Sequence, residues 1–305
     1  MVADLKLAVT GGTGFVGGRL LDLALATGHD VRALTRRPQP ARQGVTWVEG
    51  ALDKPDSLGR LVEGAGTVIH VAGVINARDA AGFEAGNVIG TAAMIAAAEK
   101  AGIKRFVHVS SLAAREPRLS TYGATKAGAE ALVAATSISS AIVRPPAVYG
   151  PGDREMLDLF RMAKRGFVLL PPHGRLSVIH ADDLGRLLLA LAGPSAPKGL
   201  LVEPDDGRHR GWSHEEFGQA LGQAIGRRVA TFSTPRPILN LCAGIDRLVR
   251  RDRAKLTADR VAYFCHPDWM VDPGRGAPEE LWRPKIDTEL GLADTAQWYR
   301  RQGWL

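Results

Sequence analysis

The chain has 305 residues, of which 45% are hydrophobic and 23% are charged, a composition that is ordinary for a soluble globular protein. Its formal net charge is +7, but the basic residues are scattered and match no nucleic-acid-binding motif, so we expect no nucleic-acid partner. The two cysteines, Cys242 and Cys265, exclude a disulfide framework and a four-thiolate zinc site. We therefore expect no metal site and a reducing, cytoplasmic environment.

The N-terminal segment has no basic stretch followed by an apolar run, as a secretory signal would. No uninterrupted apolar run reaches the roughly 18–20 residues of a membrane-spanning helix. The sequence thus argues against secretion, membrane insertion and membrane contact.

Short apolar runs alternate with helical patterns along the first half of the chain. The pattern predicts strands at residues 5–9, 31–35, 67–71, 105–110 and 140–144. It predicts helices at residues 17–27, 55–62, 83–101 and 122–135. Such alternation is typical of an α/β fold, and we expect a Rossmann-type doubly wound parallel sheet with helices on both faces.

The regular alternation ends after Pro145, where stretches rich in proline and glycine appear at residues 145–152 and 171–174. A further helix is predicted from Asp183 to Ala192, with Asp183 as its N-cap rather than as a catalytic acid. We expect one unit over residues 1–305. Residues 1–150 would form mainly the dinucleotide-binding core, and residues 151–305 mainly a small C-terminal substrate-binding cap with returning core elements.

A glycine-rich sequence, Thr10–Gly17, follows the first predicted strand and opens the first predicted helix. In this position glycines permit a tight turn and a close approach of the backbone to a pyrophosphate, which also binds the helix N-terminus. We therefore predict a dinucleotide-binding loop. The loop residues expected to bind the cofactor are Gly11, Thr13, Gly14, Phe15 and Val16.

The end of the second predicted strand indicates which dinucleotide is bound. NAD-binding proteins usually place an acidic residue here, whereas this chain has Arg36 and Arg37. A guanidinium can pair with a 2′-phosphate through charge-assisted hydrogen bonds. NADP(H) is therefore favoured over NAD(H), although both arginines could also be solvent-facing turn residues.

Together these features resemble the extended and atypical short-chain dehydrogenase/reductases, a group often labelled NAD-dependent epimerase/dehydratase. The resemblance covers most of the chain and rests on the order and spacing of eight segments: Thr10–Gly17, Gly50–Asp53 with Ser57 and Leu58, His70–Gly73, Asn87–Thr91, Val109–Ser111, Tyr122–Lys126, Arg144–Gly152 and Val178–Asp183.

The resemblance implies several further contacts with the cofactor. It places Leu52 and Asp53 beside the adenine, and Val71, Ala72 and Gly73 along the ribose and phosphates. It also places Pro145 and Val148 near the nicotinamide. Asn87 is similar to a helix residue that supports the active-site backbone in relatives.

A proton-transfer group is predicted on the helix at residues 122–135. Tyr122 and Lys126 are four residues apart and project from one helix face, so the ammonium would draw the phenol pKa toward the working range. The resemblance implies that Lys126 also binds the nicotinamide ribose. Ser111, at the carboxyl end of a predicted strand, would donate to the substrate oxygen. Ser110 is the alternative, and the resemblance favours Ser111.

Only eleven positions separate Ser111 from Tyr122, fewer than in relatives that act on nucleotide sugars. We therefore expect an NADP(H)-dependent oxidoreductase that interconverts a carbonyl and an alcohol on a small or apolar substrate, with Tyr122 as the acid/base. The alternatives are an epimerase or dehydratase that retains its cofactor, and a non-catalytic NADP(H)-binding sensor or accessory subunit.

The segment at residues 237–255 combines regularly spaced apolar residues with a basic end. Its default interpretation is a packed cap helix. A lid over the substrate, a homodimer contact and an interfacial helix on anionic lipid remain as alternatives.

Overall fold

The computed structural model describes residues 5–250 and 256–305, with Arg247 described by its backbone alone. The chain forms two compact units that are interleaved in sequence. Unit 1 runs to Arg144 and includes Leu184–Glu203 and Arg275–Arg283. Unit 2 consists of Pro145–Asp183, Pro204–Gly274 and Pro284–Leu305.

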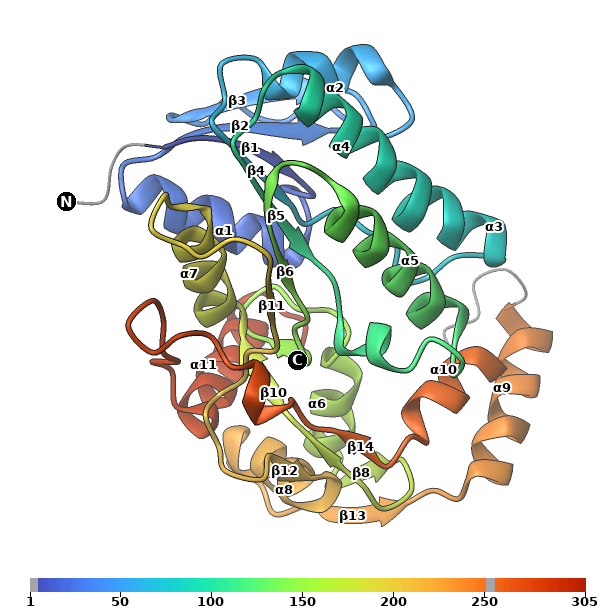
Figure 1. The fold of residues 1–305 in the computed structure, drawn as a ribbon. Helices are drawn as coiled ribbons and strands as arrows, with labels where there is room; N and C mark the ends of the chain where they lie inside the picture. The colour runs from blue at the N-terminus through green and yellow to red at the C-terminus, as the bar shows by residue number, and fades with distance from the viewer. Residues whose placement is uncertain (1–4, 251–255) are drawn as a thin grey trace. The chain divides into compact units, whose positions relative to one another are not determined.

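Unit 1 is built on a seven-stranded parallel sheet with the strand order β11-β6-β5-β4-β1-β2-β3 (Figure 1). The strands are β1 (Lys6–Thr10), β2 (Asp30–Thr35), β3 (Val45–Glu49), β4 (Thr67–His70), β5 (Arg105–Val109), β6 (Ser139–Val143) and β11 (Leu200–Val202). Central strands are buried on both faces, which is why β1 reads as a continuous apolar run through Leu7, Ala8 and Val9. The strand order reverses between β1 and β4, the switch point at which such sheets bind dinucleotides.

Helices cover both faces of this sheet, which confirms the predicted Rossmann-type fold. Figure 1 shows α1 and α7 on one face and α2, α4 and α5 on the other. Their bounds are α1 (Phe15–Ala26), α2 (Pro55–Val62), α4 (Gly90–Lys100), α5 (Thr121–Ala135) and α7 (Ala181–Ala192), with a short 3-10 turn η2 (Leu112–Arg115) before α5.

The helix predicted at residues 83–101 is a continuous helical run with a change of pitch. It starts as α3 (Ala80–Phe83), passes through a π-helical turn η1 (Glu84–Ile89) and continues as α4. By length and mean hydropathy, the run Ala80–Lys100 passes as a membrane span, although polar residues such as Glu84 and Asn87 interrupt its apolar sequence. Met94, Ile95 and Ala98 nevertheless pack into the core of unit 1, as in the core helix of a Rossmann unit.

The described residues of unit 2 form three small sheets, which pair β10 with β7, β13 with β8, and both β12 and β14 with β9. Its strands are β7 (Ala147–Tyr149), β8 (Phe167–Leu170), β9 (Arg175–Leu176), β10 (Val178–His180), β12 (Trp212–Ser213), β13 (Ala230–Ser233) and β14 (Asp268–Trp269). Its helices are α6 (Leu157–Lys164), α8 (His214–Ala224), α9 (Arg236–Arg250), α10 (Ala258–Phe264) and α11 (Thr288–Arg301), and a 3-10 turn η4 (Pro273–Arg275) joins the units. Phe160 and Tyr299 lie at the centre of its core.

The helix predicted from Asp183 begins two residues earlier, so the prediction that Asp183 is its N-cap is wrong. Asp183 lies in the first turn of α7 and is fully buried. Its carboxylate accepts hydrogen bonds from the backbone N–H groups of Lys285 (2.9 Å) and Ile286 (3.0 Å). The acid therefore fixes a returning segment of unit 2, a long-range contact that local sequence does not reveal.

Candidate active site

The glycine-rich loop joins β1 to α1 at the switch point of the sheet, and two of its glycines are required on steric grounds. Gly11 has φ +75°, and a β-carbon there would lie 2.8 Å from the backbone nitrogen of Ala72. At Gly17 a β-carbon would lie 2.0 Å from the carbonyl oxygen of Gly11, so α1 can start this close to the loop only with glycine. These two positions set the turn itself.

Gly14 differs from the other two because the space beside it is open. A β-carbon there would meet only the Gly11 carbonyl oxygen, at 3.2 Å, among the residues that the structure describes. Gly14 is also the N-cap of α1, and this helix has neither a side-chain cap nor an acidic residue in its first turn. An uncapped N-terminus beside an open backbone suits an anion, so the loop fits the pyrophosphate of a dinucleotide.

A chain of buried hydrogen bonds runs from this loop to the π-helical turn η1. The Ala72 N–H donates to Thr10 Oγ1 (3.1 Å), and Thr10 Oγ1 pairs with His70 Nδ1 (2.7 Å). His70 Nε2 pairs with Thr91 Oγ1 (3.1 Å), which in turn donates to the Asn87 carbonyl oxygen (2.6 Å). Because Thr91 gives its hydrogen to Asn87, His70 must carry its proton on Nε2 and accept from Thr10. Burial, with a smaller contribution from Lys126, lowers the pKa of His70 to about 3 and keeps the ring neutral.

The side-chain amide of Asn87 continues this network. Its Oδ1 accepts from the Val74 N–H (2.7 Å), and its Nδ2 donates to the Val74 carbonyl (3.0 Å) and to Thr125 Oγ1 (3.0 Å). The amide therefore holds the segment after β4 beside α5. This is the structural role that the resemblance implied for Asn87.

Arg36 and Arg37 follow the last residue of β2, and both side chains are exposed. Neither guanidinium has a hydrogen bond or ion pair with any residue that the structure describes. The backbone of Arg37 is held by Thr35, whose Oγ1 donates to the Arg37 carbonyl oxygen at 2.6 Å. The backbone of the turn after β2 is thus fixed, while both guanidinium groups remain free to bind an anion.

The two residues that the resemblance places beside the adenine lie between β3 and α2. Leu52 is half-buried and packs on α4, where a β-carbon at Gly90 would lie 2.7 Å from its Cδ1 atom. Asp53 is exposed in the same turn. Val71, Ala72 and Gly73 directly follow β4, at the carboxyl edge of the sheet where the glycine-rich loop also lies.

Lys126 is buried on α5 at the carboxyl end of β5. Its Nζ donates to the Val109 carbonyl oxygen at 2.7 Å, and a β-carbon at Gly73 would lie 3.6 Å from this nitrogen. Burial lowers the pKa of Lys126 to about 8, although the Glu130 carboxylate acts in the opposite direction. Tyr122 lies one turn earlier on α5, half-buried against the ring of Phe83 at 6.2 Å between centroids.

Two adjacent serines follow β5, and they have different partners. Ser110 Oγ donates to Glu130 Oε1 at 2.5 Å, inside a buried network in which Arg144 pairs with both Glu130 (2.6 Å) and Glu203 (3.2 Å). Ser111 is the N-cap of η2, and its Oγ accepts from the Ala113 N–H at 3.2 Å. A hydroxyl that accepts this bond still has its own hydrogen to donate.

The turn η2 packs on the first turn of α5, so Ser111 and Tyr122 lie on two elements in contact. A β-carbon at Gly123 would be 2.6 Å from the Ala113 carbonyl oxygen, so glycine is needed for this close packing. Pro145 and Val148 belong to unit 2, where Pro145 is buried and Val148 is half-buried in β7.

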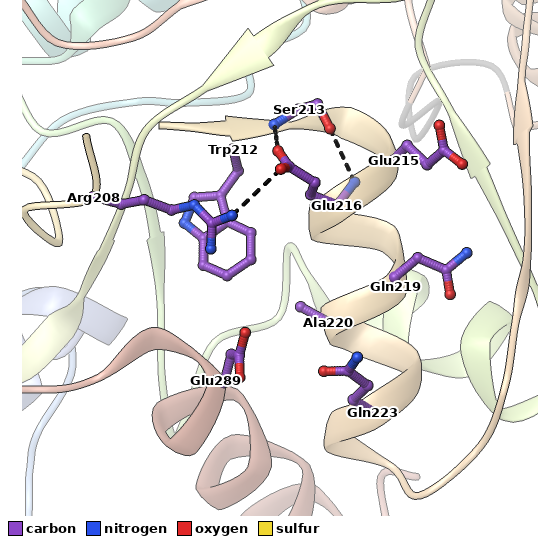
Figure 2. Close-up of a pocket in the computed structure, with 9 residues that line it drawn as sticks. All are labelled: Arg208, Trp212, Ser213, Glu215, Glu216, Gln219, Ala220, Gln223 and Glu289. Atoms are coloured by element: carbon purple, nitrogen blue, oxygen red, sulfur yellow. Dashed lines mark hydrogen bonds and ion pairs between the residues drawn. The ribbon is translucent and has the colours of Figure 1, made fainter. Parts of the chain in front are cut away.

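A surface pocket in unit 2 is separate from these residues (Figure 2). Its lining residues already pair with one another: the Arg208 guanidinium lies 3.8 Å from the centre of the Trp212 ring and 3.4 Å from Glu216 Oε1. Ser213 and Glu216 form a capping box that starts α8. These charged groups stabilise a helix end, and none of the predicted site residues lines this pocket.

In the sequence, His70, Thr91 and Arg144 belong to the motifs named above without a predicted role of their own, and no role was predicted for Thr125, Glu130 or Glu203. These side chains carry the two buried networks described above. A hint was available, because polar residues inside otherwise apolar strands and helices need buried partners. Thr91 and Thr125 each also make one local bond, but the other hydrogen-bond partners are 14 to 60 residues away in sequence, too far for any local pattern to identify.

The fold and the loop define a nucleotide-binding Rossmann enzyme of the short-chain dehydrogenase/reductase type. A model of the NAD dependent epimerase/dehydratase family matches residues 7–198. The chain belongs to this family, and it is an NAD(P)-dependent oxidoreductase.

Two relatives are similar over nearly their whole length. The chain is 38% identical to the ceramide reductase of Caulobacter vibrioides (strain NA1000 / CB15N), over 100% of this chain and 98% of the relative. It is 28% identical to the 2-alkyl-3-oxoalkanoate reductase of Stenotrophomonas maltophilia (strain K279a), over 94% of this chain and 97% of the relative. Among solved structures, the Bordetella bronchiseptica enzyme WbmG in complex with NAD and UDP shares the fold, with a TM-score of 0.76 and 18% identity over 99% of this chain and 97% of that chain.

Proposed function

We propose that the protein is an NADPH-dependent ketone reductase that acts on the carbonyl of a lipid-like molecule, with Tyr122 as the proton donor. The observation that carries this proposal is the position of Lys126. Its buried ammonium is bonded to the Val109 carbonyl at the edge of the sheet, beside Gly73 and one helical turn from Tyr122. Burying an ammonium group is energetically costly, so such a group is often functional. Here its function would be to lower the pKa of the Tyr122 phenol.

Each residue has a defined part in the proposed reaction. The cofactor, when bound, supplies the hydride that reduces the carbonyl carbon. Ser111 donates a hydrogen bond to the carbonyl oxygen and stabilises the negative charge that develops there. Tyr122 delivers the proton to this oxygen, so that ketone, NADPH and one proton give alcohol and NADP⁺. Lys126 positions the ribose and favours the ionised form of the phenol after transfer.

The preference for NADPH rests on Arg36 and Arg37. Their exposed guanidinium groups follow β2, where an acidic residue would repel a 2′-phosphate. A fixed turn whose two cations have no partner in the described part of the chain needs little reorganisation to receive an anion. The glycine-rich loop, with Thr13, Phe15 and Val16 at the start of α1, would hold the pyrophosphate.

The substrate class is inferred from the relatives. The two reductases above are named for ceramide and for a 2-alkyl-3-oxoalkanoate, both of which carry alkyl chains. The short segment between Ser111 and Tyr122 fits this class better than a nucleotide sugar. Pro145 and Val148 would lie near the nicotinamide, and unit 2 would supply the substrate cap.

The test is NADPH consumption with a panel of detergent-dispersed carbonyl compounds. The panel contains an N-acylated long-chain amino ketone, a 2-alkyl-3-oxo acid, small ketones and a nucleotide sugar, with products identified by mass spectrometry. We expect stoichiometric conversion of NADPH and a long-chain ketone to NADP⁺ and the alcohol. Conversion of the nucleotide sugar without net NADPH change would instead establish an epimerase, and binding without turnover of any carbonyl would establish a sensor.

A further inference from the structure

Helix α9 turns an apolar face toward solvent. Ile238, Leu241, Ile245 and Leu248 are spaced by three, four and three residues, so they follow one side of the helix. Their exposed fractions are 50%, 65%, 52% and 80%, and the neighbouring Val249 is 75% exposed. A surface helix of a globular protein normally turns such a stripe toward the core.

The opposite side of α9 faces the protein. Ala243 is buried, while Leu239 and Asp246 are half-buried, and α9 packs against α10 within unit 2. Asp246 accepts a hydrogen bond from the Leu256 N–H at 2.8 Å and pairs with Arg250 at 3.2 Å. The helix is therefore anchored through a short, partly polar face, and its larger apolar side chains are left outside.

Further exposed apolar side chains lie just before α9 in the same unit. Phe232 on β13 and Leu169 on β8 are register partners, and both are exposed. Figure 1 shows the chain running from β13 directly into α9. Exposed apolar side chains in this part of the sequence are thus not confined to α9.

Basic residues flank the apolar stripe. Arg236 and Arg250, at the two ends of α9, are both exposed. The sequence from residue 236 to 255 has six basic and two acidic residues, although residues 251–255 lie outside the described part of the chain. An apolar stripe with basic ends matches the hydrocarbon boundary and the anionic head groups of a lipid surface.

The same charges disfavour a second copy of this chain as the partner. A two-fold axis would pair α9 with itself, and in either orientation of the two helices basic ends would meet basic ends. An anionic lipid surface satisfies both the apolar stripe and the charge.

We propose that α9 is an interfacial helix that docks the protein on an anionic lipid surface. This proposal takes up the interfacial-helix alternative for residues 237–255 and differs from the expectation of no membrane contact. The proposal does not rest on the reaction, because it uses only residues outside the candidate active site. It would bring the protein to the surface where a lipid substrate resides.

The experiment is flotation of the full-length protein with phosphatidylcholine vesicles, with and without phosphatidylglycerol. We expect binding to the anionic vesicles that weakens as salt is added. The double variant Leu241→Glu/Leu248→Glu should reduce binding by at least about tenfold, because two exposed anchors become charged. Leu290→Glu on α11, where the leucine is 69% exposed, is the matched control and should bind as the wild type does.

Circular dichroism and NADPH titration on the same samples establish that each variant is folded. Arg250→Glu should lower binding to anionic vesicles and leave binding to neutral ones unchanged. Absence of wild-type binding to either vesicle would overturn the proposal. So would a double variant that floats like the wild type, or one whose only change is a lower molecular mass in sedimentation, which would identify α9 as a protein–protein contact.

Discussion

Ser110 donates its hydroxyl hydrogen to Glu130 across 2.5 Å, which commits this serine to the buried network around Arg144. Among the residues that the structure describes, the hydroxyl of its neighbour Ser111 accepts from the Ala113 N–H and retains a hydrogen to donate. The two adjacent serines thus have different roles: Ser110 stabilises the fold, and Ser111 is the candidate donor to the oxyanion.

The two serines should therefore respond differently to alanine. Ser111→Ala should lower kcat by about 10²–10³ while leaving the free energy of unfolding nearly unchanged, since an oxyanion donor is lost. Ser110→Ala should cost about 1–3 kcal/mol of stability, since Glu130 loses a buried donor, with a smaller effect on kcat. Urea unfolding and steady-state kinetics on both variants check this pair, and equal losses of kcat would contradict the assignment.

The glycine-rich loop allows a similar separation of binding from folding. Gly14→Val should abolish dinucleotide binding and leave the protein folded, because the new side chain enters the space beside the loop where the pyrophosphate would lie. Gly17→Val should destabilise the protein itself, since its β-carbon would lie 2.0 Å from the Gly11 carbonyl oxygen. Calorimetric titration and thermal unfolding distinguish the two, and unchanged affinity in Gly14→Val would reduce the loop to a structural turn.

Cofactor preference is tested at the end of β2. Arg36→Ala should weaken NADPH binding by about 1–3 kcal/mol, the value of a hydrogen bond to a charged partner, and should spare NADH. Arg228→Ala, at another exposed arginine, is the control. Fluorescence titration with both reduced cofactors measures the difference, and wild-type protein that binds NADH as tightly as NADPH would refute the preference.

A buried histidine pair predicts how stability depends on pH. Burial lowers the pKa of His70 to about 3 and that of His108 well below its ordinary value, with smaller contributions from Lys126, and their rings stack at 5.5 Å. Below pH ~6.5 the unfolded chain binds protons that the folded protein excludes, so stability is present at neutral pH and is lost on acidification. Each histidine contributes at most about 1.4 kcal/mol per pH unit in this window.

His108 is the better position for this test, because neither of its ring nitrogens has a hydrogen-bond partner among the residues that the structure describes. His108→Phe should keep stability at pH ~7.5 and flatten its decline between pH ~6.5 and ~5. Urea unfolding across this range gives the slopes. Identical slopes in the wild type and the variant would show that His108 does not resist protonation in the fold.

Much of unit 1 could be predicted from sequence because its signals are local. Buried parallel strands read as apolar runs, and the Thr10–Gly17 loop marks the first β-α turn. The strands β3 and β11 were not predicted. Val45–Glu49 is only partly buried, and Leu200–Val202 is three residues long and joins the sheet beside β6 after a long excursion of the chain.

The candidate site likewise has features that local sequence predicts and features that it does not. The spacing of Tyr122 and Lys126 depends on helical geometry alone, and α5 contains both residues. The partners that hold them depend on tertiary packing: Lys126 bonds to Val109 from 17 residues away, and Glu130 bonds to Arg144 from 14. The outward apolar face of α9 in unit 2 also depends on tertiary packing. From the sequence alone, an apolar stripe on a helix predicts a buried helix face.

The central claim is that Tyr122 transfers the proton to a ketone reduced by NADPH, and Tyr122→Phe tests it most directly. The ring is retained against Phe83 while the transferable proton is removed. NADPH affinity and turnover of a long-chain ketone should be measured on one preparation of wild type and variant. We predict wild-type affinity for NADPH with turnover reduced by at least about 10²-fold. Turnover at the wild-type rate would contradict the mechanism.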